Sequence, residues 1–244
     1  MTPKNPWLTC YQPNPEARLR LFCFPYAGAG VSVFRTWCKL LPEYLELCAI
    51  QLPGRESRFR EPLYTEIEPL IQDLAPVLPL DLPFVFFGHS LGALICFELT
   101  RQLRHLDQPL PLHLFVSGRV APHKPLPNPP IHQLPDAEFL AALQQKGGTP
   151  EAVLQNAELM QLFLPILRAD LEINETYSYS PQPPLACPIS ALCGLQDAEA
   201  SREDMEAWQE QTCNKFTLHL FPGDHFFIKR EQRKIVKLIS EQLS

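Results

Sequence analysis

Residues 84–92 read FVFFGHSLG, and the order of residue types in this stretch is the strongest structural signal in the chain. Its first four residues are apolar, as in a strand buried on both faces of a parallel sheet. The residues after Gly92 follow a helical period instead. Gly88 to Gly92 match G-x-S-x-G, a pattern that puts a serine on a strained turn from strand to helix. Ser90 is therefore the predicted nucleophile, and the glycines are needed where strand and helix pack closely.

Similar apolar runs recur along the chain and alternate with segments of helical period. Because alternating strands and helices form open, mostly parallel sheets, we expect an α/β fold with helices on both faces of a central sheet. The predicted strands span residues 19–24, 47–52, 84–87, 112–116, 189–193 and 216–221. The predicted helices span residues 31–41, 66–78, 91–106, 202–211 and 231–243.

One region interrupts this alternation. Residues 119–184, approximately, contain no strong strand, and helical patterns occur at 136–146 and 150–177. Asp136 is a suitable N-cap, and Gly147 with Gly148 is a suitable helix stop. We expect this insertion to lie over the carboxyl ends of the strands as a helical lid. The alternative is a helical layer without a role at the site.

Length and charge limit the classes of protein. A chain of 244 residues with 45% hydrophobic residues suits one domain, predicted to span residues 1–244. The net charge of −6 gives no basic footprint, so no nucleic-acid partner is expected. No apolar run reaches the roughly 18 residues that a membrane helix needs, and the first ten residues lack the apolar run of a signal peptide. A cytoplasmic protein is expected, and a monomer.

The cysteines are expected to be free thiols. There are eight, and several lie inside apolar runs, as Cys23 and Cys48 do. Cysteines in such positions behave as small buried hydrophobic residues in a reducing compartment. No C-x-x-C pair or metal-ligand spacing occurs, so no metal site is expected.

A serine hydroxyl is a weak nucleophile and needs an adjacent base. His225, in the segment GDHFF after the last predicted strand, stands where the chain order serine, acid, histidine places that base. His89 is adjacent to Ser90, but a neighbour on a sharp turn points elsewhere. The other histidines precede the predicted acid or lie within a strand: His105, His113, His123, His132 and His219.

The imidazole needs a carboxylate that holds its tautomer. Asp197 follows the predicted strand 189–193, at the edge of the sheet where the strands end. Asp224 is a competitor, but its adjacency to His225 makes the geometry poor. Asp197 is therefore the predicted acid.

Two backbone N–H groups should stabilise an oxyanion. One belongs to the residue after the nucleophile, Leu91. The other should come from the loop after the first predicted strand, PYAGAG at residues 25–30. Ala27 is the predicted donor, with Tyr26 and Gly28 as alternatives.

The motifs together resemble a known family, the type II thioesterases that accompany nonribosomal peptide and polyketide synthases. The resemblance runs through FPYAGAG (residues 24–30), QLPGRESR followed by EP (51–58 and 61–62), GHSLG (88–92), residues 164–177 and GDHFF (223–227). One departure is Ala29, where the family often has a second adjacent glycine. The position of Asp197 after the insertion also matches the family. The implied fold is that of the α/β-hydrolases, with a helical lid.

The resemblance implies hydrolysis of acyl groups from the phosphopantetheine arm of a carrier protein, which clears stalled synthases. It implies carrier protein domains as partners and no cofactor besides the arm of the substrate. Apolar lid residues could shape an acyl chamber, although such a stripe is more often plain core: Phe139, Leu143, Leu159, Phe163 and Ile166. Arg55 and Arg58 are either contacts for an acidic carrier or structural residues.

Three other readings remain at this point. A medium-chain fatty acyl thioesterase or a general carboxylesterase would have the same fold and the same three catalytic residues. A non-catalytic hydrolase-like binding protein is disfavoured because all three residues are present. A chain-terminating cyclase cut from a synthase is disfavoured because no carrier domain precedes Trp7.

Overall fold

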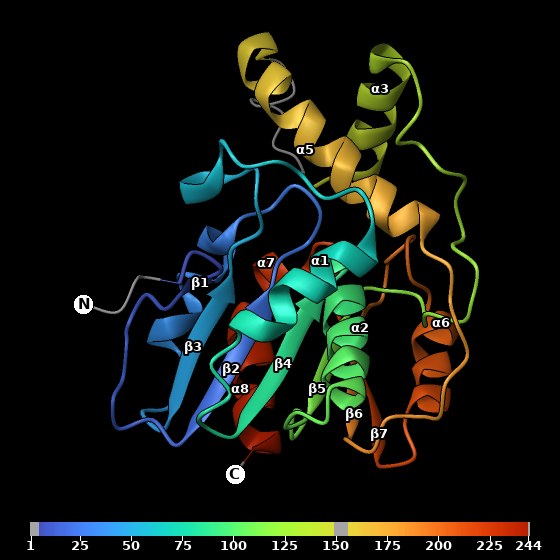
Figure 1. Ribbon diagram of the computed structural model, residues 1–244. Coiled ribbons are helices and arrows are strands. Elements are labelled where there is room, and N and C mark those ends of the chain that lie inside the picture. The colour runs from blue at the N-terminus through green and yellow to red at the C-terminus, as the bar shows by residue number, and fades with distance from the viewer. Residues whose placement is uncertain (1–4, 149–155, 244) are drawn as a thin grey trace.

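The computed structural model describes residues 5–148 and 156–243, which form one central sheet with helices on both faces (Figure 1). The sheet order is β1-β3-β2-β4-β5-β6-β7, and every pair is parallel except β1 with β3. The strands are β1 (Leu8–Thr9), β2 (Leu19–Phe24), β3 (Leu45–Ile50), β4 (Phe84–His89), β5 (Leu114–Ser117), β6 (Ile189–Gly194) and β7 (Phe216–Phe221). The described α-helices are α1 (Ile67–Leu74), α2 (Leu91–His105), α3 (Asp136–Lys146), α5 (Ala157–Thr176), α6 (Arg202–Glu206), α7 (Phe227–Arg230) and α8 (Gln232–Gln242).

The central strands are buried on both faces, which explains their unbroken apolar runs. Successive residues of β4 enter different cores: Phe86 packs with Phe22 on the face covered by α1 and α2, whereas Val85 and Phe87 belong to the core under α8. Figure 1 shows α1 and α2 in front of the sheet and α8 behind it. The predicted α/β fold is thus confirmed, and the six predicted strands are present with ends displaced by at most two residues.

The predicted helix at residues 31–41 is wrong as an α-helix. The structure has two short 3₁₀ helices there, Val31–Phe34 and Trp37–Lys39. Phe34 ends the first of these helices and Trp37 begins the second, and both rings are buried against Phe87. Burial of these two rings, rather than a long helical period, explains the local structure.

The helical insertion between β5 and β6 contains α3 and α5, which stand above the carboxyl ends of the strands (Figure 1). It has its own small core, in which Phe139 and Leu143 of α3 pack with Met160 and Leu167 of α5. The first residues of the predicted helix 150–177 lie outside the described residues. Within the described part of the chain, no helix is long and apolar enough to cross a membrane.

At α3 the predicted N-cap is wrong, whereas the predicted helix stop is present. The N-cap is Pro135, so Asp136 is the first residue of the helix rather than its cap. Its carboxylate instead lies 2.6 Å from Nη2 of Arg168 on α5, which ties the two helices together. Gly147 ends α3 with φ +72°, as predicted from its freedom to adopt this conformation.

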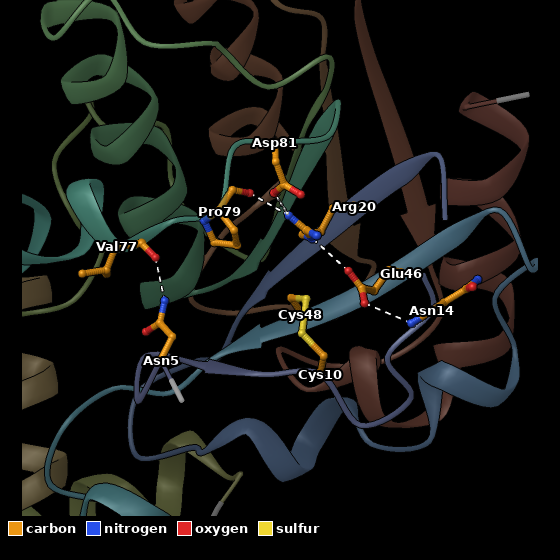
Figure 2. The surroundings of a disulfide bond; sticks show 9 residues. All are labelled: Asn5, Cys10, Asn14, Arg20, Glu46, Cys48, Val77, Pro79 and Asp81. Atoms are coloured by element: carbon orange, nitrogen blue, oxygen red, sulfur yellow. Dashed lines mark hydrogen bonds and ion pairs between the residues drawn. A yellow bond between two sulfur atoms is a disulfide. The ribbon is translucent and has the colours of Figure 1, made fainter. Parts of the chain in front are cut away.

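The expectation that Cys48 is a free thiol is wrong. Cys48 in β3 forms a disulfide with Cys10, which joins the N-terminal segment to the sheet (Figure 2). Apolar neighbours in the sequence could not reveal this, because the partner lies 38 residues away and meets Cys48 only through the antiparallel β1–β3 pair. The other six cysteines are free. Nearby, Glu46 accepts hydrogen bonds from Arg20 Nε (2.9 Å) and the Asn14 N–H (3.1 Å).

A buried histidine lies directly before β5. The His113 ring stacks on Phe115 with centroids 4.2 Å apart, and its Nε2 lies 2.9 Å from Ser190 Oγ. Burial, aided by the charges of His219 and Lys215, lowers the pKa of His113 to about 4 from its ordinary 6.5.

We expect the free energy of unfolding to fall as the pH drops from 6.5 towards 4. In this window the unfolded chain binds a proton at His113 and the folded protein does not, so acid favours unfolding by up to ~1.4 kcal/mol per pH unit. Urea unfolding at several pH values should show this slope, and His113→Phe should reduce it. Replacement of the exposed His105 by Gln is the control. An unchanged slope in His113→Phe would contradict the assignment.

Candidate active site

Ser90 occupies the turn between β4 and α2, with φ +53° and ψ −117°. This left-handed backbone is strained for a serine and is characteristic of functional turns. The Ser90 N–H donates to the carbonyl of Ser117 at the end of β5 (2.8 Å). A Cβ on Gly88 would collide with the backbone of Gly92, and one on Gly92 with the carbonyls of Phe24 and Pro25. Both glycines are therefore required by close backbone contacts.

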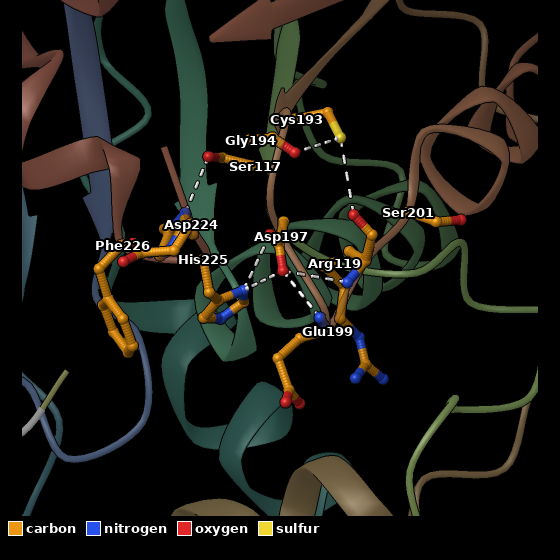
Figure 3. A network of polar contacts seen from close by, with 12 residues as sticks. Ser117, Arg119, Cys193, Gly194, Asp197, Glu199, Ser201, Asp224, His225 and Phe226 are labelled. Carbon is orange, nitrogen blue, oxygen red and sulfur yellow. Dashed lines mark hydrogen bonds and ion pairs between the residues drawn. The ribbon is translucent and has the colours of Figure 1, made fainter. Parts of the chain in front are cut away.

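His225 and Asp197 meet at the ends of the last two strands (Figure 3). His225 Nδ1 lies 3.0 Å from Oδ2 and 3.1 Å from Oδ1 of Asp197, whose side chain is completely buried. Oδ1 of Asp197 also accepts the N–H groups of Glu199 (2.8 Å) and Ala200 (3.2 Å). Because a carboxylate accepts, Nδ1 of His225 donates, and Nε2 is left free to accept a proton.

Ser90 and His225 line the same cavity, which has a volume of about 520 Å³. Among the described residues, no hydrogen bond joins the Ser90 hydroxyl to the imidazole. Such contacts are often long in a site without substrate and shorten when it binds. The structure thus brings the three predicted catalytic side chains to one edge of the sheet.

The two competing residues have other partners. His89 is fully buried, its Nδ1 lies 2.8 Å from Ser117 Oγ, and its ring centroid is 5.1 Å from that of His225. Burial, with the neighbouring charge of His225, lowers the pKa of His89 well below its usual range, so it packs as a neutral ring behind His225. Asp224 accepts the Phe226 N–H (2.9 Å) through Oδ1.

The loop after β2, residues 25–30, offers N–H groups to the cavity and is called the β2 loop below. The Gly28 N–H donates to Asp170 Oδ2 (2.7 Å), and the Ala29 N–H donates to the Tyr26 carbonyl (3.0 Å). The Ala27 N–H has no acceptor among the described residues. Leu91 is the first residue of α2, so its N–H also lacks an acceptor within the helix. Gly28 is thereby removed as an alternative to Ala27.

Apolar residues of α5 form much of the cavity wall. Leu143, Phe163 and Ile166 line it as expected. Phe139 is buried in the core of the insertion instead, and Leu159 is exposed outside the cavity. The helical period could predict an apolar face, but not which part of that face meets solvent, α3 or the cavity.

Sequence reasoning missed Asp170 and left Arg55 and Arg58 open. Both arginines are buried and paired, so they are structural and not contacts for an acidic partner. Arg58 binds Glu61 (2.5 Å) and lies over the ring of Trp7, and Arg55 binds Asp170. No local signal marks Asp170, because its partner is 115 residues away.

Groups that could hold a metal ion do not occur at this site among the described residues. Among the described residues, the one cluster with suitable ligand atoms lies away from the cavity and consists of Cys10, Glu46 and Cys48. Its two cysteines form the disulfide, and its carboxylate is bound by Arg20.

A mostly parallel sheet, a strained serine after β4, an acid after β6 and a histidine after β7 define an α/β-hydrolase. The thioesterase domain model matches residues 19–243. The chain therefore belongs to the thioesterase domain family.

Individual relatives agree with this family. "Linear gramicidin dehydrogenase LgrE" of Brevibacillus parabrevis is 45% identical over 242 residues, covering 97% of this chain and 92% of LgrE. "Gramicidin S biosynthesis protein GrsT" of Aneurinibacillus migulanus is 44% identical over 241 residues, covering 98% and 94%. The solved structure of BorB, the type II thioesterase from the borrelidin biosynthetic cluster, is 36% identical with a TM-score of 0.87 and covers 98% of each chain. The predicted type II thioesterase is confirmed.

The name of LgrE contains the word dehydrogenase, but the β2 loop of this chain does not carry a dinucleotide-binding motif. A dinucleotide fingerprint G-x-G-x-x-G needs a small third residue where helix and strand pack together. Gly28 and Gly30 supply the first two positions, but Val33 stands at the third.

Gly92→Ala should damage both stability and reactivity. The new Cβ would meet the carbonyls of Phe24 and Pro25, which cannot move without shifting the β2 loop. Overpacking of this kind costs about 1–3 kcal/mol. The urea concentration at the midpoint of unfolding should fall, and so should the rate at which a fluorophosphonate labels Ser90. A variant with wild-type stability and labelling rate would disprove the close contact.

Proposed function

We propose that this thioesterase hydrolyses acyl groups from the phosphopantetheine arm of carrier protein domains, and that it removes stalled or aberrant acyl groups from a nonribosomal peptide or polyketide synthase. The observation that carries the proposal is the cavity, which Ser90 and His225 line together with apolar residues of α5. The names of its relatives point to the same setting, because they refer to gramicidin and borrelidin biosynthesis.

In the first step, Ser90 Oγ attacks the thioester carbonyl and its proton passes to Nε2 of His225. The free Nε2 follows from the Nδ1–Asp197 hydrogen bond, and the buried Asp197 carboxylate stabilises the imidazolium. The tetrahedral intermediate collapses, the carbon–sulfur bond breaks, and the pantetheine sulfur leaves with the proton from His225. An acyl-serine remains on Ser90.

In the second step, His225 takes a proton from water, and the resulting hydroxide attacks the acyl-serine. The bond to Ser90 Oγ breaks, the proton returns to that oxygen, and a carboxylic acid is released. In both steps the N–H groups of Ala27 and Leu91 are the proposed donors to the oxyanion. The chemistry uses a proton relay and fixed dipoles, so we propose that the enzyme works without a metal or a dissociable cofactor.

The helical insertion is the proposed lid of a single domain, residues 1–244. α5 supplies Phe163 and Ile166 to the wall of the chamber. Apolar walls bind an acyl chain through loss of water-exposed surface. This lining also suits a medium-chain fatty acyl thioesterase, which is the second candidate function.

The monomeric state and the cytoplasmic location stay predictions. The Cys10–Cys48 disulfide weighs against the location, because disulfides are rare in reducing compartments.

Ser90→Ala should abolish release of acetate from an acetylated phosphopantetheinyl carrier protein, whereas the wild type should release it. The variant retains the backbone of the turn but has no nucleophile. Quenched time points resolved by intact-protein mass spectrometry measure the loss of the acetyl group. A wild type that cleaves a p-nitrophenyl ester and leaves the carrier thioester untouched would refute the proposed substrate and retain the hydrolase.

Asp197→Asn should lower kcat about 10 000-fold, because the amide would favour the wrong imidazole tautomer. The Asn oxygen can still accept the N–H groups of Glu199 and Ala200, so the protein should stay folded. Initial rates on the carrier thioester test this. Asp224→Asn is the matched control and should retain activity. If Asp224→Asn lowered kcat far more than Asp197→Asn did, Asp224 would be the acid.

A further inference from the structure

A buried carboxylate of the helical insertion is bound to the loop that carries the proposed oxyanion donor. Asp170 lies on α5 and is 2% exposed. Its Oδ2 accepts the Gly28 N–H (2.7 Å) and Arg55 Nη1 (2.5 Å), and its Oδ1 accepts Arg55 Nη2 (2.8 Å). Hydrogen bonds to ionised groups are the strong ones, and a two-pronged arginine contact restricts direction as well as distance.

This carboxylate controls the backbone next to Ala27. The Gly28 nitrogen and the Ala27 carbonyl belong to one planar peptide unit, so a fixed Gly28 N–H also fixes the Ala27 carbonyl. Only the two backbone dihedrals of Ala27 then separate this unit from the Ala27 N–H. Gly28 itself has φ +76°, a conformation that glycine adopts without steric cost, so its partners outside the loop are what fix the direction of its N–H.

Two further contacts hold the same loop against the same partners. A Cβ on Gly28 would collide with Leu167 of α5, so loop and helix already touch. The guanidinium of Arg55 reaches the Ala29 carbonyl at 3.4 Å, on the other side of Gly28. The β2 loop is therefore held by α5 at Gly28 and by Arg55 at Ala29.

Charge explains why Arg55 must accompany Asp170. A lone carboxylate beside the β2 loop would repel the negative oxygen that forms during the reaction. Arg55, itself 5% exposed, pairs with the carboxylate and makes the pair neutral. The Gly28 N–H thus gains a strong acceptor without adding net negative charge near the reacting carbonyl.

We propose that Asp170, neutralised by Arg55, is a positioning residue that aims the Ala27 N–H at the oxyanion and makes this donor dependent on the placement of α5. The proposal rests on the hydrolytic mechanism above, but it holds for any ester that Ser90 attacks.

The decisive variant is Arg55→Leu/Asp170→Leu, which removes the carboxylate without leaving a lone buried charge. We expect kcat for a p-nitrophenyl ester to fall about 10- to 100-fold, since a misplaced donor loses much of its effect. The dissociation constant of a trifluoromethyl ketone analogue, which forms an oxyanion on Ser90, should rise by the same factor. KM should stay within about twofold, because ground-state binding does not use the donor.

Two variants separate positioning from general stability. Arg55→Leu/Asp170→Asn retains an oxygen for the Gly28 N–H without leaving a lone buried guanidinium, and should recover most of the affinity for the ketone. Glu46→Gln is the matched control away from the cavity, because Glu46 is also buried, binds an arginine and accepts a backbone N–H. It should lower the melting temperature and leave the affinity for the ketone unchanged.

The proposal is overturned if Arg55→Leu/Asp170→Leu has wild-type kcat and ketone affinity. It is also overturned if KM and the ketone dissociation constant rise together, or if Glu46→Gln weakens ketone binding as much. Should Arg55→Leu/Asp170→Leu not fold, Asp170→Glu replaces it: the longer side chain displaces the acceptor, and kcat and ketone affinity must fall together about tenfold. If the wild type does not hydrolyse the carrier thioester, but the variants change ester hydrolysis and ketone affinity as expected, the proposed substrate is wrong and the role of Asp170 stands.

Discussion

The site depends on the close approach of two backbones, that of Gly92 at the start of α2 and that of Phe24 and Pro25 at the end of β2. There is no room for a single methyl group between them. This approach puts the turn that carries Ser90 beside the β2 loop, as the proposed pair of oxyanion donors at Leu91 and Ala27 requires. The parallel pairing of β2 with β4 makes the approach possible, because both strands end at the same edge of the sheet.

The sequence could predict the parts of the site that repeat a local pattern. Ser90 and Asp197 follow fully buried strands and His225 follows the half-buried β7, and the carboxyl ends of neighbouring parallel strands meet at one edge of the sheet. Contacts between distant segments could not be predicted, because nothing near Asp170 marks a partner 115 residues away. The same reason explains Cys48, whose apolar neighbours indicate burial but not the disulfide. The 3₁₀ turns at residues 31–39 show that ring packing can override a helical period.

The helical insertion contacts two segments beside the cavity, the β2 loop and the segment around Glu199. Through Asp170 it holds the β2 loop. Through Lys146, whose Nζ lies 2.5 Å from Glu199 Oε2, it holds the segment whose own N–H binds Asp197. The insertion thus lines the cavity and also contacts the β2 loop and the segment that binds the proposed acid.

The Cys10–Cys48 disulfide closes a covalent ring around the segment that contains β2 and the β2 loop. A crosslink restricts the unfolded chain more than the folded one, and for a separation of 38 residues the loss of chain entropy amounts to about 4 kcal/mol. The oxidised and reduced proteins are consequently two thermodynamic species with different midpoints of denaturation. The ambient thiol potential, and not temperature alone, then decides which of the two species is present and how stable the fold around the β2 loop is.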